Sequence, residues 1–234
     1  MKMFSWVPNF LTICNLLCGV MAIFSIFYGD FTLAFWLIIC GAIFDFFDGF
    51  AARMLRAYSE IGKQLDSLSD MVSFGVAPSV LVVHLLGGWL VQLGYPSVIS
   101  YLGLSLAAFG ALRLAKFNVD TRQSDQFIGI PTPAMSLFFF SYAMTILSCQ
   151  EISPLTGLLL TGGLVVLFSA LMVCEIPFFS FKFRSFGFGA NALRYIFALG
   201  SLVAIILGGY SSLAIIISAY IVISLVQRVV CSKK

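Results

Sequence analysis

Charge is scarce in this chain. Of its 234 residues only 10% are Asp, Glu, Lys or Arg, whereas 61% are hydrophobic, and the formal net charge is +3. No polar stretch is long enough to fold as a separate soluble domain, and no basic stripe indicates a nucleic-acid partner. The sequence therefore predicts one domain over residues 1–234 and no nucleic acid among its partners.

Histidine and paired-cysteine motifs are also lacking. His84 is the only histidine and lies in an apolar run, where we expect it to be structural or to line a cavity, since one histidine cannot build a site alone. None of the six cysteines forms a C-x-x-C pair. Cys14 and Cys18 lie about one helical turn apart, which is compatible with a metal or haem role. Packing is the favoured interpretation, because free cysteines are commonly buried as small apolar residues.

Long apolar runs follow one another almost without a break. Runs of about 18 or more residues can cross a bilayer as helices, and continuous rather than alternating hydrophobicity argues against a β-barrel. Breaks that contain Gly, Pro or charge separate the runs. The sequence predicts an all-α, polytopic membrane helix bundle with about eight transmembrane helices, over residues 9–28, 31–52, 60–86, 97–117, 131–149, 154–173, 191–208 and 211–229.

The lysines and arginines predict the orientation of these helices. If the N-terminus is cytoplasmic, all 13 basic residues fall at the cytoplasmic ends of the helices and none on the other side. A count of seven helices would break this segregation. The positive-inside tendency therefore predicts that both termini face the cytoplasm, and a prokaryotic inner membrane is the simplest location.

One cytoplasmic segment differs from the others in composition. Residues 175–189, EIPFFSFKFRSFGFG, are aromatic and basic but too short and too charged for a full span. Two interpretations are open. The segment lies in the membrane interface, with its phenylalanines toward lipid and Lys182 and Arg184 toward the headgroups, or it is a packed loop.

The few acidic residues are concentrated in one place. Five of the ten lie in FDFFDGFAARMLRAYSEIGKQLDSLSD, residues 44–70, and four of these five are aspartates. One stripe of the second predicted helix, at positions i, i+3, i+4, i+7 and i+8, consists of Asp45, Asp48, Gly49, Ala52 and Arg53. A stripe of the third, at i, i+4 and i+8, consists of Gly62, Asp66 and Asp70. The short connection makes these helices an antiparallel pair, so the four carboxylates should face one shared space.

Four carboxylates in a space of low dielectric repel one another unless cations lie between them. Oxygen ligands without His or Cys favour Mg²⁺, Mn²⁺ or Ca²⁺ over Zn²⁺, and two divalent ions would balance four negative charges. A two-metal site suits phosphoryl transfer. Gly49 and Gly62 leave room for a ligand, and Arg53 can hold a phosphate oxygen. The alternative, that the aspartates are ordinary charges near a membrane surface, does not explain why they form two stripes.

The pattern D-x2-D-G-x2-A-R-x8-G-x3-D-x3-D over residues 45–70 resembles the signature of the CDP-alcohol phosphotransferase family, the integral-membrane enzymes of phospholipid synthesis. The resemblance implies that two divalent metal ions, Mg²⁺ or Mn²⁺, are held by Asp45, Asp48, Asp66 and Asp70. It implies that Asp70 is also the general base. The CDP moiety of CDP-diacylglycerol would be bound by Gly49, Ala52, Arg53 and Gly62, with Arg53 near the pyrophosphate. The resemblance further implies a homodimer and a six-helix catalytic core, here residues 8–173, to which the last two helices are additions.

Three further segments resemble the phosphatidylserine synthase branch of that family: PNFLTICNLLCG (8–19), RLAKFN (113–118) and FIGIPTPA (127–134). This resemblance implies transfer of a phosphatidyl group from CDP-diacylglycerol to the hydroxyl of L-serine, giving phosphatidylserine and CMP. Serine needs a partner for its carboxylate, and the candidates on the cytoplasmic side are Arg113, Lys116, Asn118 and Arg122. The basic residues among them could instead only set the topology. Pro131 and Pro133 suit a rigid first turn of the fifth helix.

Two other functions stay open at this point. The same chemistry could use another acceptor alcohol, glycerol 3-phosphate or an inositol phosphate, although a phosphorylated acceptor would want more basic residues around the site. From a different class, a cation transporter could use intramembrane aspartates to bind a permeating ion. Transporters usually place such groups near the bilayer midplane, whereas these aspartates flank a basic cytoplasmic connection.

Overall fold

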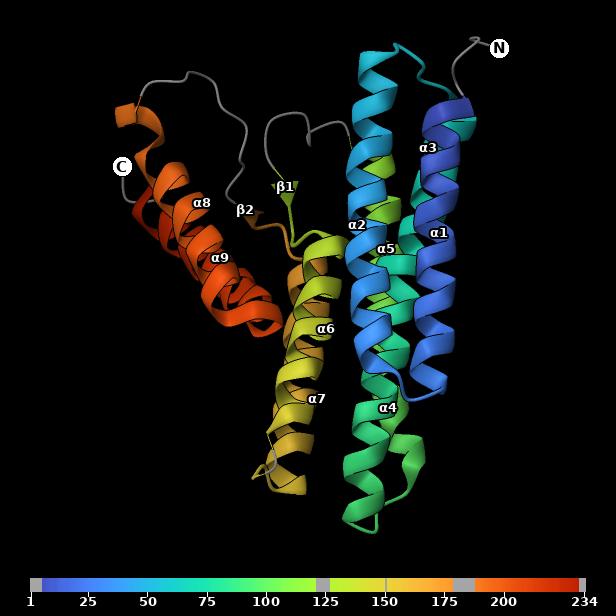
Figure 1. Ribbon diagram of the computed structural model, residues 1–234. Helices are drawn as coiled ribbons and strands as arrows, with labels where there is room; N and C mark the ends of the chain where they lie inside the picture. Colours follow the sequence, from blue (N-terminus) through green and yellow to red (C-terminus); the bar gives the residue numbers. More distant parts are fainter. Residues whose placement is uncertain (1–5, 121–126, 150, 179–187, 232–234) are drawn as a thin grey trace.

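The chain forms a bundle of helical rods that run alternately in opposite directions (Figure 1). This computed structural model describes residues 6–120, 127–149, 151–178 and 188–231. Six rods are single helices: α1 (Trp6–Phe27), α2 (Phe31–Met54), α6 (Thr132–Ser148), α7 (Pro154–Val173), α8 (Phe188–Gly208) and α9 (Ser212–Cys231). Two rods are composite: α3 (Glu60–Asp70) continues through the π-helix η1 (Met71–Val76) into α4 (Ala77–Gln92), and the 3₁₀-helix η2 (Ser97–Leu104) continues into α5 (Ser105–Val119).

The helical rods of the described chain overlap the eight predicted segments, although the third rod continues to Gln92, six residues beyond the predicted end at residue 86. Six helical stretches are long and apolar enough, by length and composition, to cross a membrane. One of these, Ile196–Val226, includes parts of both α8 and α9, and α6, with 17 residues, is shorter than the other spans. The chain is thus a helical integral membrane protein, with one pair of two-residue strands among the described residues.

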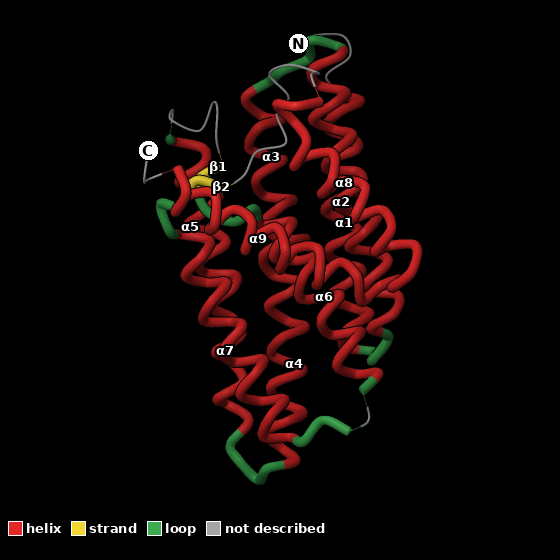
Figure 2. The backbone as a smooth tube through the Cα atoms, turned by 90° about the vertical axis from the view of Figure 1, so that its left-hand side faces the viewer, coloured by secondary structure: helices red, strands yellow, loops and turns green. Residues whose placement is uncertain are grey.

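The helices α1 to α7 form an upright bundle, from which a hairpin of α8 and α9 leans away (Figure 1). Figure 2 looks onto this hairpin from the side, and η4 (Gly209–Ser211) forms its turn. The helix α9 is attached to α6: the backbone N–H of Ala214 donates to Ser141 Oγ at 2.9 Å, and Ile217 and Ile221 are buried. Because the first N–H groups of a helix lack partners within it, Ser141 acts as a cap supplied by a neighbouring helix.

Close contacts between helices hold the lower part of the bundle together, as expected where lipid is as apolar as the side chains themselves. The ring of Trp89 in α4 lies over Gly157 in α7, where a Cβ would come within 2.6 Å of Trp89 Cε2. Phe138, Phe139 and Phe168 are buried, and the ring centroids of Phe138 and Phe168 lie 4.3 Å apart. Since α6 contacts α2 and α4 contacts α1, this aromatic region supports the helices that precede it in the chain.

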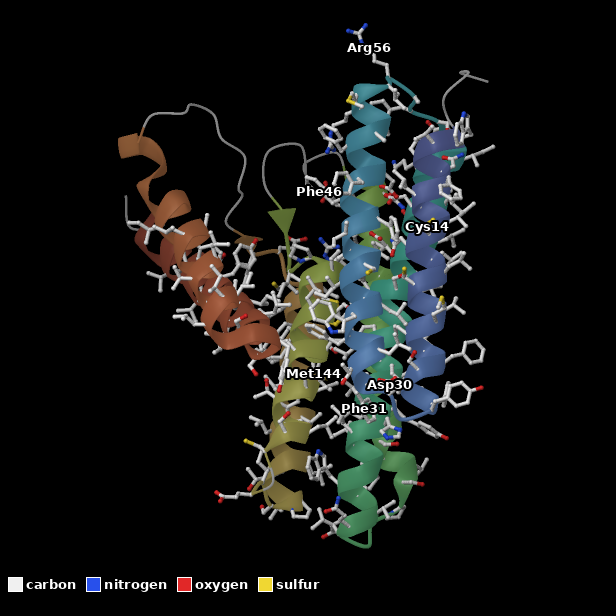
Figure 3. The ribbon with its side chains drawn as sticks, viewed as in Figure 1. Cys14, Asp30, Phe31, Phe46, Arg56 and Met144 are labelled. Atoms are coloured by element: carbon white, nitrogen blue, oxygen red, sulfur yellow. The ribbon has the colours of Figure 1, made fainter. Side chains whose placement is uncertain are left out.

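Local sequence signals set the starts of the two helices that carry the acidic residues. Asp30 caps α2, and its carboxylate accepts a hydrogen bond from the N–H of Leu33 at 2.9 Å. Ser59 caps α3 in the same way, accepting from the N–H of Gly62 at 3.0 Å. Between the two helices Arg56 has a φ of 49°, the left-handed conformation common where a helix ends. Figure 3 shows Arg56 at the upper end of the molecule, so α2 and α3 reverse direction there.

The strands β1 (Phe127–Ile128) and β2 (Pro177–Phe178) join the FIGIPTPA segment to the end of α7. The backbone N–H groups of Gly129 and Ile130 donate to the carbonyls of Ile176 and Leu171, at 3.0 and 3.1 Å. Gly129 has a φ of 75°, and a Cβ there would lie 2.6 Å from the carbonyl oxygen of Met172. Only glycine combines this backbone conformation with so close an approach.

The two prolines of GIPTPA occupy the positions that the sequence predicts. Pro131 directly precedes α6 and Pro133 lies in its first turn. Of the segment 175–189, residues 177–178 form β2, and residues 188–189 begin α8. Residues 179–187, which decide between an interfacial segment and a packed loop, lie outside the described residues.

Candidate active site

Four carboxylates, two from α2 and two from α3, come together in one space. One oxygen from each of Asp45, Asp48 and Asp66 lies within 4.8 Å of the others. The carboxyl groups of Asp45 and Asp70 are within hydrogen-bonding contact. Asp48 is buried and the other three are partly buried. The two predicted stripes therefore converge on one space, as side chains three or four residues apart on a helix must share a face.

The helix α1 forms a third wall of this space, which the sequence interpretation did not include. Thr12 Oγ1 donates to Asp48 Oδ2 at 2.6 Å, and Asn15 Nδ2 donates to Asp70 Oδ1 at 3.3 Å. Both residues are buried. The sequence did carry a signal for them, since Thr12 and Asn15 are polar residues at i and i+3 in a mostly apolar helix.

Two serines fix the position of α3 and η1 along α1. Ser69 Oγ donates to the carbonyl of Thr12 at 3.0 Å, and Ser73 Oγ donates to the carbonyl of Asn15 at 2.9 Å. A Cβ at Gly19 would collide with Ser73, so the two helices touch closely at that point. The π-helical turn begins immediately after Asp70, and such turns occur often at functional sites. These contacts hold the acidic end of α3 in register with the polar face of α1.

A pocket of about 460 Å³ opens beside Asp48 and Asp66. Three residues that were predicted to bind the CDP moiety line it, namely Gly49, Ala52 and Gly62. Polar groups that were not predicted also line it, namely Asn9, Ser59 and Lys63. A Cβ at Gly62 would lie 3.0 Å from Asn9 Oδ1, so the lack of a side chain there keeps the pocket open.

Arg53 lies near this pocket but on the outside of α2. Its side chain is exposed, and Nη1 is 3.6 Å from the position that a Cβ on Gly49 would occupy. The guanidinium therefore lies back along the helix toward Gly49, where it can reach an anionic group held in the pocket.

Of the described residues that were predicted to bind serine, Arg113 is the most buried. It is 7% exposed, its Nη1 donates to Thr132 Oγ1 at 3.5 Å, and its Nε has no partner among the described residues. The guanidinium is close enough to Asp70, and to Tyr220 of α9, to interact electrostatically with both. Arg113 thus provides a buried positive charge near Asp70.

The other predicted serine-binding residues have different surroundings. Lys116 is exposed. Asn118 joins α5 to α3, because its Nδ2 donates to Ser67 Oγ at 2.8 Å and its carbonyl accepts from Lys63 Nζ at 3.3 Å. Arg122 lies outside the described residues.

Among the described residues, neither the histidine nor any cysteine belongs to the cluster of possible metal ligands. His84 is exposed, and its ring lies 5.2 Å from that of Phe31 near the lower end of α2 (Figure 3), where it lines a small cavity. The five cysteines whose side chains are described are free thiols. Cys18 is buried beside α2, as the packing interpretation predicts.

The carboxylates suit divalent metal ions. Two oxygens that bind one ion at about 2.1–2.4 Å cannot lie more than about 4–5 Å apart, and the oxygens of Asp45, Asp48 and Asp66 lie within 4.8 Å of one another. The donor set consists of hard oxygen ligands, which favours Mg²⁺ or Mn²⁺ over softer metals. The residues present therefore fit such ions.

This fold and site together define a class of protein. Its members are integral membrane proteins in which a carboxylate cluster opens to a pocket at one end of the helix bundle. Within that class, the chain belongs to the CDP-alcohol phosphatidyltransferase family, whose family model matches residues 5–174. The match contains every carboxylate of the cluster and ends with α7, so α8 and α9 lie beyond it.

Three related proteins are similar to this chain over at least three quarters of its length. The chain is 39% identical over 178 residues to a CDP-diacylglycerol–serine O-phosphatidyltransferase of Bacillus subtilis, covering 76% of this chain and 92% of that protein. It is 36% identical over 179 residues to a protein of the same name from Helicobacter pylori strain J99, covering 75% and 72%. It is 32% identical over 201 residues to one from Methanocaldococcus jannaschii, covering 86% and 83%.

Proposed function

We propose that this protein transfers the phosphatidyl group of CDP-diacylglycerol to the hydroxyl of L-serine, giving phosphatidylserine and CMP. The observation that carries the proposal is the carboxylate cluster open to the 460 Å³ pocket between α1, α2 and α3. The names of the related proteins supply the substrates. The cluster lies near one end of the bundle, where a headgroup can reach it while the acyl chains stay in the bilayer.

Two divalent ions, Mg²⁺ or Mn²⁺, would be held by the aspartates of the cluster: Asp45, Asp48, Asp66 and Asp70. When bound, they supply positive charge that polarises the pyrophosphate and stabilises the departing CMP. The protein contributes the placement of the ligands: Thr12 holds Asp48, and Asn15 holds Asp70.

The CDP moiety would occupy the pocket beside the carboxylates. Gly49, Ala52 and Gly62 leave its walls without large side chains, so the nucleotide can approach the helix backbones. Arg53 lies at its edge, where its planar guanidinium would hold the pyrophosphate. The reacting phosphorus is then presented toward Asp70 and Arg113.

Asp70 would be the general base. The serine oxygen forms a bond to the phosphorus that carries diacylglycerol, the bond from that phosphorus to the CMP oxygen breaks, and the serine proton passes to the Asp70 carboxylate. Asp70 suits this role because it lies at the end of its stripe, between the metal-binding carboxylates and the buried Arg113. Such a base must lie within hydrogen-bonding distance of the group whose proton it accepts.

Arg113 would bind the serine carboxylate, since its buried Nε has a free donor and carboxylates pair with guanidinium through parallel hydrogen bonds. We expect Arg113→Lys to raise the KM for serine about tenfold or more, because lysine keeps the charge but loses the fork of donors. The KM for CDP-diacylglycerol should change little. Lys116, Asn118 and Arg122 stay predictions as serine-binding residues.

The matched control is Arg56→Lys, the same replacement at an exposed arginine on the turn between α2 and α3 (Figure 3). Steady-state kinetics with each substrate varied in turn should leave both KM values of this control near those of the wild type. An equal rise for both substrates in Arg113→Lys would assign Arg113 to folding or topology instead.

The proposed reaction is tested by supplying purified protein with CDP-diacylglycerol, Mg²⁺ or Mn²⁺, and one acceptor at a time. CMP release and a phosphatidylserine product are expected with L-serine and not with glycerol 3-phosphate or inositol phosphate. A preference for a phosphorylated acceptor would leave the proposed reaction type unchanged, but serine would no longer be the acceptor. Ion flux into liposomes without CMP release would show a cation transporter instead.

We further propose that residues 8–173 are the catalytic core, that the protein is a homodimer, and that the site and both termini face the cytoplasm of a prokaryotic inner membrane. Support for the orientation comes from the basic residues: Arg53, Arg56 and Lys63 surround the end of α2 and the start of α3, beside the pocket. The end of α5, which carries Lys116, meets this region through the contact of Lys63 with Asn118. Positive charge of this kind marks the cytoplasmic side of membrane proteins.

A further inference from the structure

Asn15 is buried completely in a helix that contributes no carboxylate, yet its side chain reaches the site. It is 0% exposed, and its Nδ2 donates to Asp70 Oδ1 at 3.3 Å. Its neighbour on the same helix face, Thr12, lines the pocket, whereas Asn15 is not among the residues that do. Asp70 is not among the pocket-lining residues either, so the contact between Asn15 and Asp70 lies behind the pocket wall.

The orientation of the Asn15 carboxamide follows from this contact. A carboxylate accepts hydrogen bonds, so the nitrogen must face Asp70 and the oxygen must point the other way. Asn15 Oδ1 has no hydrogen-bond partner among the described residues and lies where a Cβ on Gly41 of α2 would come within 3.0 Å. An oxygen buried without a donor costs free energy, so the protein tolerates this cost to keep the nitrogen on Asp70.

The backbone of Asn15 is held as firmly as its side chain. Ser73 Oγ donates to the Asn15 carbonyl at 2.9 Å, and the close contact of Gly19 with Ser73 lies one turn further along α1. The same η1 segment that follows Asp70 therefore also fixes Asn15. The donor and the carboxylate that it holds are parts of one interlocked contact between α1 and α3–η1.

We infer that Asn15 is a positioning residue for Asp70 and that Gly41 helps to keep it in place, because a side chain at position 41 would press on the Asn15 carboxamide. Asn15 holds one oxygen of Asp70 and thereby fixes the orientation in which the carboxylate meets the incoming hydroxyl. The inference rests on the proposed function, since it assigns Asn15 and Gly41 to the base of that reaction. Neither residue touches the substrate.

A double-mutant cycle separates this role from general packing. Asn15→Ala should lower kcat about 10–100-fold, the usual value of a hydrogen bond to a charged group, with both KM values within about threefold of the wild type. Gly41→Ala should lower kcat about 5–30-fold in the wild type, because its methyl group displaces the carboxamide. In the Asn15→Ala background the same change should cost less than about twofold, because the group that it displaces is gone.

The matched control is Gly163→Ala, a glycine inside α7 where an added Cβ meets nothing within 4 Å. It should leave kcat unchanged in both backgrounds. Calorimetric binding of CDP with Mg²⁺ should be retained in all variants, which shows that the site is formed. If Asn15→Ala does not bind CDP, Asn15→Ser replaces it in the cycle, since serine frees the same space.

The outcomes separate this inference from the proposed function. No serine-dependent CMP release by the wild type would overturn the function itself before any variant is compared. With an active wild type, normal kcat in Asn15→Ala would overturn the positioning role. Equal losses from Gly41→Ala in both backgrounds would overturn the link between Gly41 and Asn15, whereas non-additive losses with intact CDP binding support it.

Discussion

Asp70→Asn is expected to lower turnover by roughly 10²–10⁴-fold, the usual contribution of a positioned general base. The serine hydroxyl is a weak nucleophile at neutral pH, and asparagine keeps the size of aspartate while losing its basicity. The variant should still fold, because an asparagine oxygen at position 70 can accept the hydrogen bond that Asn15 Nδ2 donates to Asp70. Binding of CDP-diacylglycerol should therefore persist while kcat falls.

The matched comparisons are Asp45→Asn and Asp66→Asn, which change other carboxylates of the same cluster. These variants should weaken metal binding, and raising the metal concentration should partly restore their turnover. Calorimetry of metal and nucleotide binding, measured beside turnover for each variant, distinguishes the two roles. Normal turnover in Asp70→Asn, or a loss explained entirely by missing metal, would show that Asp70 has no separate role as base.

The sequence predicted the helices and the convergence of the aspartates because both depend on local periodicity. Asp45 and Asp48 must share a face of α2, as Asp66 and Asp70 must share a face of α3, whatever surrounds them. The connection between the helices is too short for any arrangement but a tight reversal, and its end is marked by the Ser59 cap. Such features need no knowledge of distant contacts.

The role of α1 could not be predicted in the same way. The sequence shows that Thr12 and Asn15 are polar residues in an apolar helix, but several helices could receive them. Packing decides which helices these residues contact. Thr12 contacts Asp48, 36 residues away, and Asn15 contacts Asp70, 55 residues away. The surroundings of the expected antiparallel pair of α2 and α3 were not predicted either. The helix α1 packs against both helices, and the carboxylates of α2 and α3 face one another across the space between them.

Long-range contacts also account for what the branch motifs do. Asn118 is predicted as a serine ligand, and in the structure its amide donates to Ser67 Oγ at the junction of α5 and α3, a contact that the sequence does not reveal. Gly129 needs its glycine because the end of α7 approaches it, some forty residues further along the chain. Arg113 was predicted from its guanidinium and from its place in the RLAKFN segment on the cytoplasmic side, whereas its burial near Asp70 depends on how α5 packs in the bundle.

Removal of divalent metal is expected to abolish transfer completely, and Mg²⁺ or Mn²⁺ should restore it. Four carboxylates share one partly buried space, and the Arg113 guanidinium lies near one of them, Asp70. Without bound ions these carboxylates repel one another in a medium of low dielectric. Treatment with EDTA followed by exhaustive dialysis, with CMP release as the readout, tests the requirement directly.

A second measurement, independent of activity, is the thermal stability of the protein in detergent. An ion that binds only the folded state stabilises it by about 2.7 kcal/mol at a concentration one hundred times its Kd, so added Mg²⁺ should raise the Tm of the metal-free protein. Asp66→Asn should lose most of this rise because it removes a ligand of the cluster. The matched control is Asp30→Asn, which changes an aspartate outside the cluster and keeps the cap of α2, since asparagine caps helices as well as aspartate does. Its rise in Tm should equal that of the wild type. Full activity in metal-free protein, or the same rise in Tm for Asp66→Asn as for Asp30→Asn, would contradict a metal site at these carboxylates.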